Sequence, residues 1–419
     1  MLAALVNAFR VPELRKKLFY TACILVIYRI GSFIPVPGVD AAAIIAEFKS
    51  VAGAGAGILN LLDLFSGGAL SRFTVFALNI GPYITASIVL QLLAYVIPSL
   101  EKLQKEGVEG RKQIAKYTTY LSIVLALVQS YTYMAILSDA LTGGIVQKLL
   151  IMVSMTAGAA FCVWLGGLIT QNGIGNGVSL LIFAGIVARI PTGLVQGVKL
   201  IAAGGVNILA VILLLIIGLA ITVATVAVEL GQRKIPVQYP KRVVGRRVYG
   251  GQSTHIPLKV NQAGVIPVIF ASSILAFVTT IGQYIPAVSG FFNSTAYTTW
   301  IYNGLYMILI VLFTYFYTGI TFNPVDVADN MKKYGGFVPG IRPGKPTSDY
   351  LSKITSRLTF CGAIFLALLA VAPNITSALT PLQIGFGGTS LLIVIGVALD
   401  TVRQIESQLV MRQYEGFMK

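Results

Sequence analysis

The chain has 419 residues, of which 56% are hydrophobic and only 11% are charged, and its mean hydropathy is +0.82. Soluble domains carry about 25% charged residues, so this composition excludes a soluble globular protein and indicates an all-α polytopic membrane protein. The net charge of +16 is explained first by Lys and Arg gathered in cytoplasmic loops, ahead of nucleic-acid binding.

Ten apolar segments are each predicted to cross the membrane as a helix, because about 20 apolar residues match the thickness of the hydrocarbon core. Arg15–Lys17 and the apolar run after them look like the first half of a signal peptide, but no small-residue cleavage site follows. We therefore expect this run to be the first membrane helix. The predicted spans are 18–37, 73–98, 117–137, 148–170, 178–197, 207–230, 263–285, 300–322, 354–373 and 388–405.

The distribution of positive charge predicts the orientation in the membrane. Alternate connections hold most Lys and Arg residues, in the stretches 10–17, 102–116, 233–259, 332–357 and 403–419. The opposite loops hold only Lys49, Arg72, Lys148 and Lys199, with Arg189 near one end of a span. Since positive charge gathers on the cytoplasmic side, both termini are expected to be cytoplasmic.

The span at 73–98 has an unusual composition for a helix that faces lipid. Asn79, Gly81 and Pro82 interrupt it, and polar groups or helix breakers at membrane depth are tolerated where they face protein or water. Between them, Ile80 and Ile84 share one helical face with the isoleucine four residues further on. The span either lines a path with an apolar collar or is an ordinary bundle helix kinked by its proline.

The connection 38–72, on the side opposite the termini, is a candidate re-entrant segment. A Gly-Ala run at 53–57 precedes ILNLLDLFSGG, and a helix this short cannot cross the bilayer. The short apolar helix either sits in the mouth of a pore or lies in the membrane interface.

Two cytoplasmic loops, 231–262 and 323–353, are long for a compact bundle, and long ordered loops usually carry function. The first is strongly basic, and its β-branched runs around Gly250–Gly251 predict a two-stranded finger. The second contains YGGFVPGIRPGKPT with Arg342 at its centre. Either both loops are solvated positive loops or they dock a partner, and their length favours docking.

No catalytic constellation is found in the sequence. His255 is the only histidine, so an HExxH zinc site is excluded, and Asp400 is the only aspartate well inside a span. The stretch 340–346 lacks the spacing and the Ser or Thr of a phosphate loop, and the glycines at 173–177 follow a helix and no strand. We predict no enzymatic activity and no cofactor. The cysteines lie inside apolar runs and are expected to be small core residues: Cys23, Cys162 and Cys361.

An ion-coupled transporter of small solutes is the alternative function. Such transporters place ionisable residues near the midplane and use broken helices. Here Arg29 and Glu229 lie toward span ends, and the polar residues inside the spans are neutral. These neutral residues are Thr85, Gln91, Gln129, Asn261 and Gln262. A path without a charge relay favours passive conduction over proton coupling.

Seven collinear motifs resemble those of the SecY family of protein-translocation channels, and the resemblance covers nearly the whole chain. The motifs are PVPGVD (35–40), LFSGGALSRFTVFALNIGPYITASI (64–88), EKLQKEGVEGRK (101–112), GIGNGVSLLIFAGIV (173–187), GRRVYGGQSTHIPLKVNQAGVIPVIFASS (245–273), YGGFVPGIRPGKPT (334–347) and GGTSLLIVIGVALDT (387–401).

The resemblance implies ten helices in two pseudo-symmetric five-helix halves, 1–204 and 205–419, around a central pore. It implies an apolar pore ring formed by Ile80, Ile84, Val178, Ile182, Ile269 and Ile393, with Ile266 close by. An apolar constriction of this kind dewets and blocks ions. Two positions depart from the family pattern, because Gly81 and Val178 are smaller than the usual residues and would widen or loosen the ring.

The resemblance also assigns the segments around the pore. The helix at about 58–68 corresponds to the plug, with Ile58, Leu59, Leu62, Leu64 and Phe65 as its apolar residues. The lateral gate is implied at Thr85, Gln91, Gln129 and Asn261, and docking of a motor or ribosome at Lys241, Arg246, Arg247 and Arg342.

The implied function is a channel in the bacterial cytoplasmic membrane that moves secretory polypeptides across and releases membrane segments laterally into lipid. The implied partners are SecE-like and SecG-like small subunits, the SecA motor ATPase, the ribosome through ribosomal RNA contacts of the basic loops, signal sequences, nascent polypeptides and membrane lipid.

Overall fold

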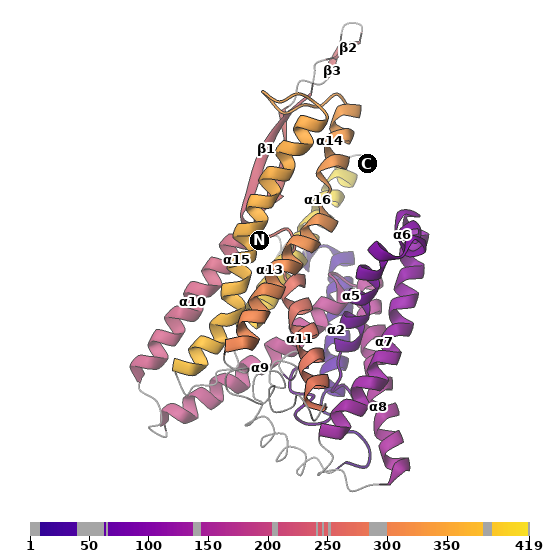
Figure 1. Cartoon of the computed structure of the whole chain (residues 1–419), viewed down its shortest axis with the longest axis vertical. Coiled ribbons are helices and arrows are strands. Elements are labelled where there is room, and N and C mark those ends of the chain that lie inside the picture. Colours follow the sequence, from indigo (N-terminus) through magenta and orange to yellow (C-terminus); the bar gives the residue numbers. More distant parts are fainter. Residues whose placement is uncertain are drawn as a thin grey trace. The chain divides into compact units, whose positions relative to one another are not determined.

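A computed structural model describes residues 9–39, 63, 66–136, 144–202, 208–239, 242–244, 247–249, 253–284, 300–379 and 388–417 (Figure 1). The chain forms two compact units. The first contains Met1–Val206, Ser273–Ile301 and Leu382–Lys419, and the second contains Asn207–Ser272 and Tyr302–Pro381. We describe each unit by itself.

Every predicted span overlaps a helix. The helices are α2 (Pro12–Gly31), α5 (Gly81–Val96), α7 (Val108–Ile136), α8 (Ile145–Asn172), α9 (Gly177–Ala202), α10 (Ile208–Leu230), α11 (Ile266–Tyr284), α13 (Tyr302–Thr321), α15 (Lys345–Leu379) and α16 (Gly388–Phe417). Within the described residues, three helical stretches are long and apolar enough to cross a membrane alone, namely Ile145–Asn172, Tyr302–Lys333 and Lys345–Ala372. A bent pair of helices would make a fourth span. The number of ten spans therefore stays a prediction.

The helix predicted over 73–98 begins eight residues later than predicted and ends two residues before its predicted end. Residues 73–80 form turns, with left-handed backbone at Phe73 and Asn79, where φ is 48° in each case. Helix α5 begins only at Gly81, because Pro82 in the first turn cannot donate a backbone hydrogen bond and is favoured there. At its other end the chain bends by 107° into α6 (Pro98–Lys105). Hydropathy detected the apolar stretch but carried no information on these dihedral angles.

The turn segment before α5 is paired with residues 34–36, which follow the end of α2. Pro35 and Thr74 form an isolated antiparallel bridge. The Val36 amide donates to the Phe73 carbonyl at 3.1 Å, and the Val75 amide donates to the Ile34 carbonyl at 3.0 Å. Residues 34–36 and 73–75 thereby satisfy one another's backbone groups without helix or sheet.

Unit 1 is a bundle in which close helix contacts depend on glycine. Helix α7 packs between α5 and α8, α9 packs on α8 and α16, and α2 contacts both α8 and α9. A Cβ atom at Gly158 of α8 would overlap the Val75 carbonyl oxygen, and one at Gly177 would overlap the Gly166 carbonyl oxygen. The bundle core therefore includes backbone packed directly on backbone.

Unit 2 combines the packed helices α13 and α15 with α14 (Pro324–Lys333) and two β-hairpins (Figure 1). Strands β1 (Gln232–Gln238) and β4 (Ser253–Lys259) are antiparallel, with Gln232 opposite Lys259 and Gln238 opposite Ser253. Strands β2 (Arg242–Val244) and β3 (Arg247–Tyr249) pair so that Val244 faces Arg247. The predicted finger is confirmed as strand pairing, and it reverses direction before Gly250–Gly251.

The two long loops, predicted as separate features, share one small core. The Gln238 and Phe337 backbones exchange two hydrogen bonds, of 2.9 and 3.0 Å. Beneath them lie buried side chains from the hairpin, α14, the following loop and α15: Ile235, Val237, Leu258, Met331, Val338 and Leu351. We call the described residues of 232–259 and 324–351 the cytoplasmic subdomain, after the side of the membrane that the sequence predicts for them.

Two glycines on α8 provide a test of this packing. Gly158→Ala should lower the apparent melting temperature of the detergent-purified protein, because the new methyl group meets the Val75 backbone and overpacking costs about 1–3 kcal/mol. Gly167→Ala is the matched control, since a Cβ there meets nothing within 4 Å. It should leave the melting temperature unchanged or raise it slightly, because Ala favours helix over Gly. Equal melting of the two variants would contradict the packing.

Candidate functional site

The apolar residues predicted to form the pore ring are divided between the two units. In unit 1, Ile80, Ile84 and Val178 belong to one apolar cluster, built around Tyr28 and Leu165. Ile80 is fully buried there, while Ile84 and Val178 are partly buried. The structure thus brings together three of the predicted ring residues, from the start of α5 and the start of α9.

The remaining ring residues are placed less directly. Ile182 on α9 and Ile393 on α16 are also buried in unit 1. Ile266 and Ile269 belong to unit 2 and lie in the first turn of α11, where both are partly buried. A closed ring that includes all of them stays a prediction.

The glycine cluster at 173–177 has a structural role at the corner between α8 and α9. The Asn176 side-chain oxygen accepts hydrogen bonds from the Val178 amide at 3.1 Å and the Ser179 amide at 3.3 Å, as an N-terminal cap. The Ile174 amide donates to the Thr21 hydroxyl of α2 at 3.1 Å. These bonds fix Val178 at the start of its helix.

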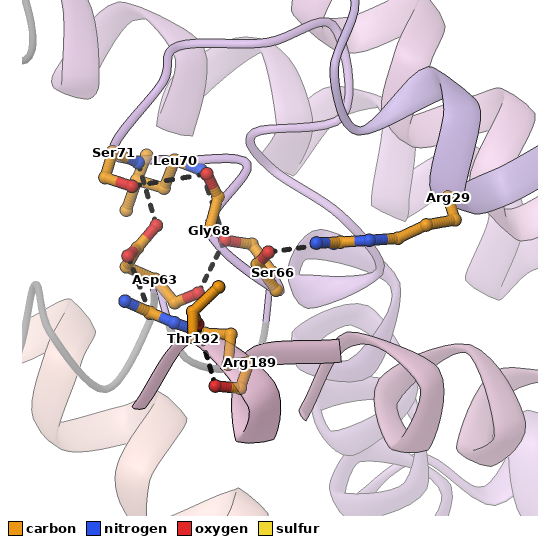
Figure 2. A network of polar contacts seen from close by, with 9 residues as sticks. Arg29, Asp63, Ser66, Gly68, Leu70, Ser71, Arg189 and Thr192 are labelled. Carbon is orange, nitrogen blue, oxygen red and sulfur yellow. Dashed lines mark hydrogen bonds and ion pairs between the residues drawn. The ribbon is translucent and has the colours of Figure 1, made fainter. Parts of the chain in front are cut away.

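The five apolar residues predicted for the plug lie outside the described residues: Ile58, Leu59, Leu62, Leu64 and Phe65. From 58–68 the structure describes Asp63 and Ser66–Gly68. These residues and Ser71 form a polar network with α2 and α9 (Figure 2). We call the described residues of this stretch, Asp63 and Ser66–Ser71, the plug anchor.

The plug anchor is held by arginines from two helices. Arg189 of α9 lies 2.7 Å from the Asp63 carboxylate, whose other oxygen accepts the Ser71 amide at 2.8 Å. Arg29 of α2 donates to the Gly67 carbonyl at 2.9 Å (Figure 2). Sequence reasoning missed this arrangement, although a lone aspartate in a short apolar segment was a signal that a cation is needed nearby.

A second arginine contact lies beside the anchor. The guanidinium carbons of Arg29 and Arg72 lie 4.8 and 4.6 Å from the centroid of the Phe33 ring. Both distances are within the range of a cation–π interaction. Arg72, predicted only as one of the few loop cations on its side, therefore packs against Phe33, just after the end of α2.

The predicted lateral-gate residues of unit 1 make local bonds on a packed helix pair. The Thr85 hydroxyl donates to the Gly81 carbonyl at 3.2 Å, and the Gln91 amide donates to the Ser87 hydroxyl at 3.2 Å, all on α5. Gln129 is half-buried on α7, which packs against α5.

The fourth predicted gate residue, Asn261, lies in unit 2. Its amide donates to the Glu229 carboxylate at 2.7 Å and to the Gly264 carbonyl at 3.0 Å. Both Asn261 and Glu229 are buried. No contact across a gate is described, so the gate assignment stays a prediction.

Among the predicted docking residues, Arg342 is exposed on the loop between α14 and α15. Its carbonyl accepts the Thr347 hydroxyl at 2.8 Å. Gly340 and Gly344 on either side have φ values of 82° and 97°, which only glycine adopts readily. Lys241 and Arg246 lie outside the described residues, and of Arg247 only the backbone in β3 is described.

The residues considered for other chemistry are scattered. His255 is exposed on β4, and the described residues contain no group of three His, Cys, Asp or Glu that could hold a metal ion. Cys162 is buried as expected, whereas Cys23 and Cys361 are exposed. The core prediction is wrong for those two, because a membrane helix is apolar all round and an apolar run does not identify the buried face.

Comparisons with known proteins agree with the motifs. The SecY family model matches residues 74–402. Proteins named protein translocase subunit SecY are 48% identical in Mycobacterium tuberculosis, 49% in Streptomyces coelicolor and 45% in Corynebacterium glutamicum, each over 100% of both chains.

Solved structures share the fold. A structure described as a protein conducting channel is 22% identical with a TM-score of 0.67, and the channel of a canine ribosome–channel complex is 21% identical with a TM-score of 0.64. In both cases the match covers 96% of each chain. With a family model over most of its length and full-length relatives of 45–49% identity, the chain belongs to the SecY family.

Proposed function

We propose that the chain is a protein-conducting channel of the bacterial cytoplasmic membrane, which passes secretory polypeptides across and releases membrane segments into lipid. Full-length identity of 45–49% to proteins named protein translocase subunit carries this proposal. The apolar cluster of Ile80, Ile84 and Val178 supports it. Branched apolar side chains hold back water and ions, yet can deform around any extended polypeptide without reading its sequence.

The proposal includes the finer architecture. Ten helices form two pseudo-symmetric halves, 1–204 and 205–419, and both termini are cytoplasmic. The asymmetry of Lys and Arg between alternate loops supports this orientation. A weak polar seam at the lateral gate fits release into lipid, because hydrogen bonds inside membranes contribute only about 0.6 kcal/mol on average.

The cytoplasmic subdomain is the proposed docking surface for the external source of energy. Its own core packs strands β1 and β4 together with the loop that carries Arg342, which suits a partner that pushes or pulls. The canine structural neighbour is described in a ribosome–channel complex. For this chain we propose a SecA-type motor and the ribosome as alternating partners, with SecE-like and SecG-like small subunits in the membrane.

The competing function, ion-coupled transport of small solutes, is distinguished by reconstitution. Vesicles that contain the channel complex should import a signal-bearing precursor only when the motor and ATP are present. The chain itself should have no enzymatic activity. Accumulation of a small solute against its gradient, driven by an ion gradient, would contradict the proposal.

The apolar seal is testable with two isoleucines. The double variant Ile84→Asn/Ile269→Asn should raise the ion conductance of resting channels in planar bilayers several-fold, because the amides hydrogen-bond water where the ring is now apolar. Val89→Asn is the matched control, since Val89 is exposed on the same helix. A double variant as tight as the wild type would mean that these isoleucines only pack a core.

The docking surface is testable at Arg342. Arg342→Glu should reduce motor-driven import of a precursor by about tenfold or more, because Arg is enriched among the few interface residues whose loss costs roughly 2 kcal/mol or more in binding. Folding and insertion should be unaffected, since the side chain is exposed. Lys353→Glu, an exposed position on α15, is the control for the charge change. Normal import by the Arg342 variant would exclude this loop from docking.

A further inference from the structure

We propose that the ion pair of Asp63 and Arg189 is a latch that holds the plug anchor on helix α9 and sets how easily the channel opens. The inference rests on the proposed channel function and adds to it a pair of positioning residues. Asp63 lies within 58–68, the segment assigned to the plug, while Arg189 lies 126 positions later in the chain. A solved structure that is 23% identical to this chain is described as having a plug domain that stabilises the closed state of its channel.

The Asp63 carboxylate is almost completely withdrawn from solvent. Its side chain is 2% exposed, and its two oxygens contact Arg189 at 2.7 Å and the Ser71 amide at 2.8 Å. The Asp63 carbonyl accepts both the Ser66 hydroxyl and the Gly68 amide at 3.0 Å (Figure 2). Among the described residues, Arg189 of α9 is the cation that pairs with this buried carboxylate.

The plug anchor also rests directly on the α9 backbone. Gly67 has a φ of 67°, and a Cβ atom built there would lie 2.8 Å from the Gly185 Cα. The Gly67 carbonyl also accepts a hydrogen bond from the Arg29 side chain of a second helix, α2. Movement of the plug away from α9 must separate the Asp63–Arg189 pair, because the pair spans this contact.

The two partners of the pair are not equivalent. The Arg189 side chain is 35% exposed, whereas the Asp63 side chain is 2% exposed. Removal of Arg189 leaves a buried carboxylate without its cation, which strongly disfavours the closed arrangement. Neutralisation of Asp63 as Asn keeps an acceptor for the Ser71 amide and leaves without its carboxylate only an arginine that is already partly exposed.

Because of this asymmetry, the variants should differ in how far they open the channel, in an order that the simple loss of one contact would not produce. Arg189→Gln should shift the population toward the open channel more than Asp63→Asn does. The double variant should open less than Arg189→Gln alone, because Asp63→Asn removes the stranded charge. Arg189→Lys should stay close to the wild type, since it keeps the cation.

The experiment uses the full chain, purified with its small membrane subunits, for the wild type and these four variants. Resting conductance in planar bilayers, and export of a precursor whose signal sequence is too weakly hydrophobic for the wild type, report opening. Arg189→Gln should raise both several-fold, Asp63→Asn less, and the double variant should fall back toward Asp63→Asn. Lys148→Gln, which removes an exposed cation from the side opposite the predicted cytoplasmic face, should match the wild type.

Thermal melting of the same preparations separates a latch from a purely structural ion pair. Lower melting of Arg189→Gln with unchanged conductance and unchanged signal selectivity would overturn the latch. So would a double variant that leaks more than Arg189→Gln. Failure of the wild type to import any signal-bearing precursor with a motor present would instead overturn the proposed function, so the two outcomes are distinguishable.

Discussion

Buried backbone that is not helical must find its hydrogen-bond partners inside the protein, and residues 66–80 are where this chain meets that constraint. The segment satisfies its amides and carbonyls through its own turns, through residues 34–36 and through Ser66 and Asp63. Side chains then fix the segment to α2 and α9. The late start of α5 at Gly81, and with it the position of Ile80 and Ile84, depends on this irregular piece.

The same segment places opposite chemistries side by side in unit 1. At its start the Asp63 carboxylate and the Gly67 carbonyl contact arginines of α9 and α2, while Phe73 and Phe76 are buried in apolar clusters. Ile80 then joins the cluster that contains Ile84 and Val178. An irregular segment with polar contacts at one end and apolar contacts at the other connects the plug anchor to the residues proposed to seal the pore.

Sequence patterns predicted much of this architecture. Hydropathy located every helix that matches a predicted span, and strand patterning located the finger. The start of α5 was not predicted correctly, because hydropathy does not report the left-handed backbone at Phe73 and Asn79. Two long-range features were also not predicted: the shared core of the two loops and the pair of Asp63 with Arg189. Both join residues far apart in the chain, so no local sequence pattern indicates them.

The junction between the cytoplasmic subdomain and α15 has a mechanical consequence. Helix α15 is 35 residues long and begins at Lys345, in the same stretch as the Arg342 loop. At 1.5 Å per residue its stretch before Pro373, Lys345–Ala372, forms a rod of roughly 40 Å, and Leu351 near its start is buried in the subdomain core. No flexible linker therefore separates the Arg342 loop from α15. A force applied to that loop would be transmitted directly to α15 and to α13, which packs along it.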